Sequence, residues 1–260
     1  MKLEDYLKVE ASAITSCPVR GLCPAGQLCA THDDSGESAL YPVVVEVRAG
    51  ELIWIDLRFE QRCMFIKSGV FASISDLGGT ETPSALFGAG QALGLSELYV
   101  SRDVASTYYL RALTDATICS TPAKAMRRRL ESLSNPQALS IVSCALTNIS
   151  AATYTSVRTL AQPLVHERLL FLFLTIDELL ARERRPFDCL GLTHDELAPL
   201  VGSDRVSVTR SLHRLEDEGI IKLGYRRIDL LDGWRVKAQA SAVPATRFHQ
   251  TNAGGRAREF

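Results

Sequence analysis

Short runs of β-branched and apolar residues, separated by glycine turns such as Ala49-Gly50 and Ser68-Gly69, follow one another from Tyr41 to Pro122. Such runs between turn signals are typical of successive strands. We expect strands at residues 43–47, 52–57, 63–67, 70–75, 107–112 and 117–120. The pattern therefore predicts an antiparallel roll or barrel over about residues 40–122.

After Pro122 the pattern becomes helical. Apolar residues recur at alternating steps of three and four, which is the spacing of a heptad seam. The seam consists of Leu139, Val142, Leu146, Ile149, Thr153, Ser156 and Leu160. It predicts a parallel dimer helix, and its polar positions make the pairing marginal, as a switch requires. The alternative is a helix packed on its own domain.

A helix-turn-helix pattern follows. Thr193 and Glu196 form a capping box, which opens a helix through Val201. Gly202 makes the turn, and a second helix, capped by Ser203 or Asp204, runs to residue 218. The alternative is a helical hairpin with solvated charges.

The second helix has distinct inner and outer sides. Its inner side holds Val208, Leu212 and Leu215, at i, i+4 and i+7. Because arginine makes the commonest specific base contact, Arg210 is the first candidate for sequence reading. The candidate DNA-binding residues are Arg205, Val206, Ser207, Thr209, Arg210 and His213. Arg205 and Thr209 can contact bases or phosphates, and residues 220–230 predict a hairpin wing.

Cysteine is the most informative residue type. Cys17, Cys23, Cys29 and Cys119 are candidate ligands, because iron–sulfur clusters and zinc prefer thiolates. The N-terminus has no cationic stretch leading into an apolar one, which predicts a cytoplasmic protein with reduced thiols. We expect the remaining cysteines to be buried packing residues; they are Cys63, Cys144 and Cys189.

Composition limits the functional classes. The chain has 260 residues and a net charge of −1, so DNA must be bound by a local basic surface. No run approaches the roughly 18 apolar residues of a membrane span. The predicted units are a cysteine-rich sensing segment (1–35), a roll (36–122), a dimerisation helix (123–162), a DNA-binding domain (163–235) and a disordered tail (236–260).

The second helix and wing, residues 202–212 and 215–221, resemble those of the CRP/FNR superfamily of bacterial transcription regulators. The resemblance covers roughly residues 15–232. It implies an α+β fold with an antiparallel β-roll of the cyclic-nucleotide-binding type, a long dimerisation helix and a winged helix-turn-helix. It also implies three partners: twofold-symmetric double-stranded DNA, a second copy of the chain and RNA polymerase.

The cysteines resemble those of the FNR branch. Cys23 and Cys29, with Gln27-Leu28 between them, match the end of its cluster motif, and Cys119 matches its distant ligand. The resemblance implies an oxygen-labile [4Fe-4S] cluster, shielded by Leu28. Arg20 stands where the family has its first ligand, so Cys17 would replace that ligand.

The helix departs from the FNR branch at Val206, where the branch usually has a glutamate. A valine cannot accept a hydrogen bond from cytosine but can touch a thymine methyl. With this valine the helix is similar to that of the nitrogen-control regulator NtcA. The resemblance implies a palindrome of the form GTA-N8-TAC.

Other sensors and classes remain as alternatives. A thiol sensor could form a disulfide between Cys23 and either Cys17 or Cys29, and haem could bind through His32. Cyclic AMP is disfavoured, because residues 87–94 lack the acidic residue of its phosphate cassette and Arg102 stands alone. The chain lacks a nucleotide-binding glycine motif and an acid–base constellation, so we expect no enzyme.

Overall fold

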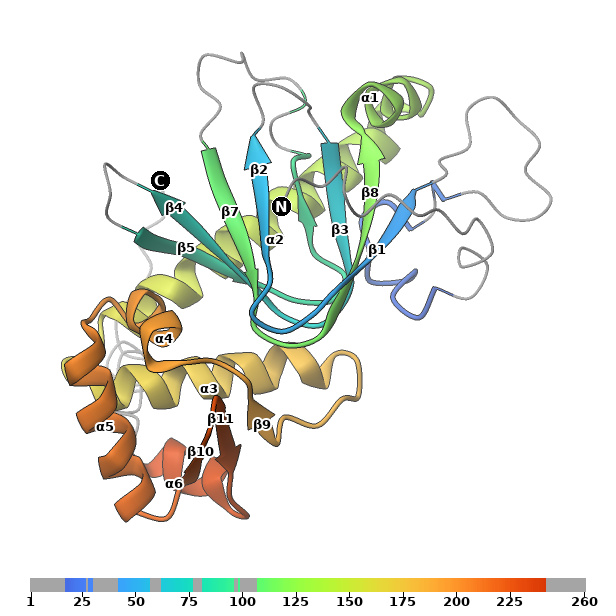
Figure 1. Cartoon of the computed structure of the whole chain (residues 1–260). Helices are drawn as coiled ribbons and strands as arrows, with labels where there is room; N and C mark the ends of the chain where they lie inside the picture. The colour runs from blue at the N-terminus through green and yellow to red at the C-terminus, as the bar shows by residue number, and fades with distance from the viewer. Residues whose placement is uncertain are drawn as a thin grey trace, which may run out of the picture.

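The computed structural model describes residues 17–26, 28–29, 42–56, 62–76, 81–95, 98 and 107–241. Figure 1 shows a β-roll, a long helix α2 that passes behind it, and a smaller C-terminal domain below. This architecture confirms the predicted α+β fold with its roll, helix and winged helix-turn-helix. No helix in the described part of the chain is long and apolar enough to cross a membrane.

Two antiparallel sheets form the roll, with strand orders β1-β8-β3-β6 and β2-β7-β4-β5. Alternate side chains face opposite sides of a strand. Met64, Ile66 and Ile118 fill the interior, whereas Phe65 and Cys119 belong to a separate outer cluster. The strands are β1 (Val43–Val47), β2 (Leu52–Asp56), β3 (Arg62–Ser68), β4 (Phe71–Asp76), β5 (Glu81–Phe87), β6 (Ala92–Leu93), β7 (Thr107–Ala112) and β8 (Ala116–Pro122).

Strands β5 and β6 are not among the predicted strands. Pro83 obscures β5 in the sequence, because proline cannot donate to a ladder. The structure accommodates it on an edge strand, where the register with β4 shifts between Ser73 and Ile74. Strand β6 has only two residues, which is too short for a periodic signal.

The prediction of one continuous helical segment over residues 123–162 is wrong. The segment divides into α1 (Ala123–Glu131) and α2 (Asn135–Leu160). Ser134 caps α2, and its backbone N–H and its hydroxyl both donate to Gln137 Oε1, at 3.3 and 2.8 Å. Pro136 lies in the first turn of α2, where its missing backbone N–H costs no hydrogen bond, so it favours the start of a new helix here.

The C-terminal domain contains the predicted reading elements. Its elements are α3 (Val165–Ala181), β9 (Cys189–Leu190), α4 (His194–Leu200), α5 (Arg205–Asp217), β10 (Ile221–Gly224), β11 (Arg227–Leu230) and α6 (Trp234–Ser241). The predicted disorder from residue 236 is wrong as far as residue 241. Trp234 and Ala238 lie one helical turn apart and are buried, and Trp234 stacks edge-on against Phe187. Residues 242–260 lie outside the described residues.

The roll and the C-terminal domain share one core. Val70, Leu86 and Leu113 of the roll belong to the same buried cluster as Leu169 and Phe173 of α3. An ion pair of 3.0 Å between Arg111 of β7 and Glu196 of α4 adds to the joint, and both side chains are largely buried. Arg111 belongs to the sheet β2-β7-β4-β5, whereas Cys119 belongs to the sheet β1-β8-β3-β6 on the other side of the roll (Figure 1).

Candidate cysteine centre and nucleic-acid interface

The cysteine loop, residues 17–26 and 28–29, is a series of tight turns. The backbone N–H groups of Arg20, Cys23 and Gly26 donate to carbonyls three or four residues earlier, at 3.2, 2.8 and 2.9 Å. Gly26 packs so closely that a Cβ atom there would lie 1.9 Å from the Arg20 carbonyl oxygen. The loop therefore requires glycine at this position because of close approach.

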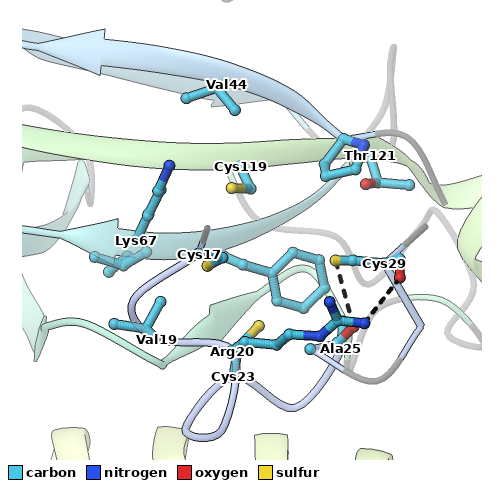
Figure 2. Close-up of a pocket in the computed structure, with 14 residues that line it drawn as sticks. Cys17, Val19, Arg20, Cys23, Ala25, Cys29, Val44, Lys67, Cys119 and Thr121 are labelled. Atoms are coloured by element: carbon cyan, nitrogen blue, oxygen red, sulfur yellow. Dashed lines mark hydrogen bonds between the residues drawn. The ribbon is translucent and has the colours of Figure 1, made fainter. Parts of the chain in front are cut away.

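Cys17, Cys23, Cys29 and Cys119 all line one cavity between the cysteine loop and the roll (Figure 2). Cys119 lies in the middle of β8, paired with Val44 of β1 and Phe65 of β3. Residues about ninety positions apart in sequence thus meet, as predicted. The cavity measures about 30 Å³, which is room for about two water molecules.

Burial favours the protonated form of three of these thiols. It raises the pKa of Cys23 to about 12 and that of Cys119 to about 11, and it also raises the pKa of Cys29. Proximity of Cys17 and Cys29 raises the pKa of Cys119 further. Several thiolates at this place would repel one another, so the anionic form requires a cation among the sulfurs.

Basic side chains stand beside the sulfurs. Arg20 donates from its guanidinium to the Cys29 carbonyl at 3.4 Å, and its charge acts to lower the pKa of Cys29 (Figure 2). Lys67 acts in the same direction on the pKa of Cys119. The Cys29 thiol donates to the Ala25 carbonyl at 3.5 Å.

The donor set fits an iron–sulfur cluster in its chemistry, because thiolates are the usual ligands of such clusters. The sulfurs are not pre-arranged for binding: across the described residues, no three Cys, His, Asp or Glu side chains are placed to hold a metal ion.

Other predicted residues of this region have different positions. Leu28, expected to shield the cluster, is buried but does not line the cavity; it packs in the outer cluster with Met126 and Ala145. Cys63 is fully buried, as predicted for a packing residue. The same prediction is wrong for Cys144, which is exposed on α2, and Cys189 is only half-buried.

Helix α2 has one face on the roll and one in solvent. Ala145, Ala152 and Thr159 are buried. Of the predicted seam, Leu139 is 66% exposed and Leu146 47% exposed, and Thr153 is also exposed. Val142 and Ile149 are half-buried against the roll, so the seam lies at the edge of the packed face.

The exposed stripe of α2 continues beyond the predicted seam. Tyr154 and Val157 are 64% and 57% exposed, although the heptad register did not include them. Leu160, predicted to belong to the seam, packs under the helix-turn-helix. A Cβ at Gly202 would lie 2.8 Å from its Cδ2 atom. Arg168 donates to the carbonyls of Val201 and Gly202, which holds this turn against the end of α2.

The recognition helix α5 presents the predicted outer side. Val208, Leu212 and Leu215 are fully buried, and Asp204 caps the helix by accepting from the Ser207 backbone and hydroxyl at 2.9 and 2.7 Å. Of the candidate DNA-binding residues, Arg205, Val206, Arg210 and His213 are exposed. Ser207 is half-buried, and its hydroxyl is engaged with the cap.

Arg210 differs from its neighbours in having no partner among the described residues. Arg205 lies 3.4 Å from Asp195, and His213 lies 3.6 Å from Glu216. The Thr209 hydroxyl donates to the Arg205 carbonyl at 2.8 Å and lies 2.8 Å from His194 Nδ1. Arg210 is therefore the side chain most ready to bind an acceptor.

Several linking residues have no local signal in the sequence. Glu196, besides capping α4, bridges Arg111 of the roll and Arg226 at the wing tip, at 3.0 and 3.8 Å. Tyr225 at the same tip is 95% exposed. His194 contacts α5 across the turn. These contacts are long-range, so local periodicity does not indicate them.

The alternative ligand sites are described in part. Gln91, in the segment that would hold a cyclic nucleotide phosphate, accepts from the Gly88 N–H at 2.7 Å and donates to the Asn148 carbonyl of α2 at 3.4 Å. Its side chain therefore joins the roll to α2. His32 and Arg102 lie outside the described residues.

Residues 167–237 match the Crp-like helix-turn-helix domain. Over 126 residues the chain is 32% identical to the transcriptional regulator SdrP of Thermus thermophilus; this region is 48% of the chain and spans 58% of SdrP. The chain therefore carries a Crp-like helix-turn-helix domain.

Solved structures resemble the chain over a longer range. A CRP/FNR-family regulator of Thermus thermophilus, TTHA1359, is 25% identical with a TM-score of 0.57, covering 76% of this chain and 97% of its own. TTHB099, a CRP-family regulator of the same organism, is 21% identical with a TM-score of 0.59, covering 76% and 95%. These relatives have the predicted fold, and both are transcriptional regulators.

Proposed function

We propose that the chain is a homodimeric, DNA-binding transcription regulator whose DNA affinity depends on an iron–sulfur cluster held by Cys17, Cys23, Cys29 and Cys119. The observation that carries the proposal is the meeting of these thiols, from the cysteine loop and the middle of β8, at one cavity. The exposed recognition helix, with an Arg210 that is unpaired among the described residues, supports the DNA-binding part.

The buried thiols favour a ligand role. When bound, a [4Fe-4S] cluster would supply a redox centre that oxygen or nitric oxide can destroy. The chain contributes four sulfurs in an apolar pocket and keeps Arg20 and Lys67 beside them, where positive charge offsets thiolate charge. A ligand that orders the cysteine loop stabilises everything that packs on it.

The outer cluster supports a path from the cysteine loop to α2. Ala25 and Leu28 of the loop belong to it together with Met126 of α1 and Ala145 of α2. Ala145 is next to Leu146, which lies on the exposed stripe. Ordering the loop therefore holds α2 in one position, and loss of the cluster releases it.

The exposed stripe of α2 fits a second copy of the chain. Leu139, Leu146, Tyr154 and Val157 expose apolar surface along one helix, which is unfavourable unless it is covered. Twofold pairing of α2 would place the recognition helices about 34 Å apart, one turn of DNA. Such a dimer would bind double-stranded DNA and act with RNA polymerase.

The site GTA-N8-TAC is the proposed target. Val206 is 65% exposed at the start of α5, where it is available to a thymine methyl. Replacing it with glutamate introduces an acceptor for cytosine, so Val206→Glu should shift binding toward TTGAT-type half-sites. A gel-shift panel tests this, and an unchanged preference would refute the assignment.

Iron and sulfide analysis of anaerobically purified protein tests the cluster. The wild type should contain both elements and show a broad visible absorption band that bleaches in air. Cys119→Ser should lose iron, sulfide and band, whereas Cys144→Ser, a change at an exposed cysteine away from the cavity, should keep all three. A colourless, iron-free wild type would exclude the cluster.

A thiol–disulfide sensor is the second candidate, because the same cysteines are free and close together. The thiolate is the reactive form, and burial raises the pKa of Cys23 to about 12, which disfavours oxidation at this residue. Mass spectrometry after mild peroxide treatment separates the two candidates: a disulfide from Cys23 to Cys17 or Cys29 in an iron-free, DNA-binding protein would favour the thiol sensor.

A further inference from the structure

Thr209, on the recognition helix, has a hydroxyl that is already engaged. Its proton is donated to the Arg205 carbonyl one turn earlier, at 2.8 Å. The same oxygen lies 2.8 Å from His194 Nδ1, on the neighbouring helix α4. When the carbonyl accepts that proton, His194 Nδ1–H donates the second bond; in the other tautomer Nδ1 accepts the proton instead, so the hydroxyl proton is engaged in either case.

We propose that Thr209 reads DNA through its methyl group, and that His194 is a positioning residue that fixes this orientation. A hydroxyl held by a backbone carbonyl and an imidazole N–H has no proton left for a base or a phosphate. Besides one lone pair of the oxygen, Thr209 can still offer its methyl, whose natural partner in the major groove is the methyl of thymine. The proposal rests on the DNA-binding function and is independent of the cluster.

The neighbour of Thr209 strengthens the assignment. Val206 lies three residues earlier, on the same helix face, and is 65% exposed. Together the two residues form a small apolar strip beside Arg205 and Arg210. A strip of methyl groups next to an arginine suits a half-site in which thymine is adjacent to guanine.

The environment of His194 favours the neutral form of its ring. Partial burial, then the charges of His213 and Arg205, lower its pKa, while Asp195 acts in the opposite direction. A neutral ring with its proton on Nδ1 satisfies the contact with Thr209. A β-branched residue has few χ1 states, so the contact with His194, together with the bond to the Arg205 carbonyl, is enough to select one of them.

The test uses the duplex that the full-length wild type selects from a randomised pool. Each thymine in turn is replaced by deoxyuridine, which removes only the methyl group. At one thymine or more per half-site, wild-type affinity should fall about fourfold, the effect expected for one buried methyl-sized group. Thr209→Val keeps the methyl and should retain this sensitivity, whereas Thr209→Ser keeps the hydroxyl and should lose it at one position.

A double-mutant cycle tests the role of His194. His194→Ala should reduce the thymine sensitivity in the wild type but have no further effect in Thr209→Val, because the valine rotamer does not depend on a hydrogen bond. Circular dichroism and thermal unfolding establish that each variant folds.

Two results separate the possible failures. If Thr209→Val loses the sensitivity and Thr209→Ser keeps it, the hydroxyl reads the DNA and the proposal is wrong, although DNA binding stands. If the wild type selects no duplex from the pool, the DNA-binding function itself is wrong, and this proposal fails with it.

Discussion

The two functional regions are prepared to different degrees. The recognition helix is complete: its inner side is buried, its cap is formed and Arg210 is exposed without a partner in the described chain. The cysteine centre is incomplete, with the protonated thiols of Cys23 and Cys119 at a cavity of about 30 Å³. In the proposed regulator, a signal therefore needs to act only on the cysteine side, because the surface proposed to read DNA is already assembled.

Glu196 is where we expect the largest effect, because it joins the C-terminal domain to the roll. Glu196→Ala removes the capping box of α4 and leaves Arg111 largely buried without its carboxylate partner. We expect a loss of about 3 kcal/mol of unfolding free energy in urea, the lower end for breaking a buried pair. Asp195→Ala, at an exposed neighbour, should cost little; equal losses would show that the Arg111 pair is unimportant.

Gly26 offers a way to damage the cysteine side alone. Gly26→Ala places a Cβ against the Arg20 carbonyl and should destabilise the loop by about 2 kcal/mol, as overpacking does. Gly21→Ala, in the same loop, meets nothing within 4 Å and is the matched control. Faster alkylation of Cys23 and Cys119 in Gly26→Ala, with normal reactivity in Gly21→Ala, would confirm the expectation.

A change at Arg210 tests DNA binding by the recognition helix without touching the cysteine loop. Arg210→Ala should weaken specific DNA binding by about 10- to 100-fold, the range for one bidentate base contact, without changing stability. Arg128→Ala, which removes an exposed arginine from α1, controls for total charge. Fluorescence anisotropy measures both. An Arg210 variant that keeps full affinity would show that another residue reads the base.

The smallest effect concerns pH in the metal-free protein. The raised pKa values of Cys23 and Cys119 favour the packed loop below about pH 9, the ordinary range of a thiol, and this contribution is lost as the pH rises toward 11 and 12. Near neutral pH no change is expected. Residue-resolved alkylation should label Cys144 first at pH 8; prompt labelling of Cys23 there would contradict the burial.

The elements with local signals could be predicted from the sequence. The cap at Thr193, the turn at Gly202 and the inner side of α5 depend on neighbouring residues, and the structure has all of them. The prediction that Cys23 and Cys119 lie close together depends on the family resemblance, since their spacing in the sequence does not show that distant thiols meet.

The features that escaped prediction depend on tertiary packing. Pro83 hides β5, whose edge position is not visible in a single run of residues. Cys144 is exposed because Ala145, its neighbour, occupies the packed face of α2. The bond from His194 to Thr209 joins two helices, and each residue alone has the pattern of an ordinary polar position.

Gly202 packs directly on Leu160, near the end of α2, so the rotation of α2 about its axis determines how the helix-turn-helix is oriented. One residue inserted into the last turns of α2 would rotate everything beyond it by about 100°, and seven residues would nearly restore the orientation while adding about 10 Å of length. In the proposed dimer, the number of residues in α2 would therefore determine which separation of DNA half-sites the two recognition helices can bind.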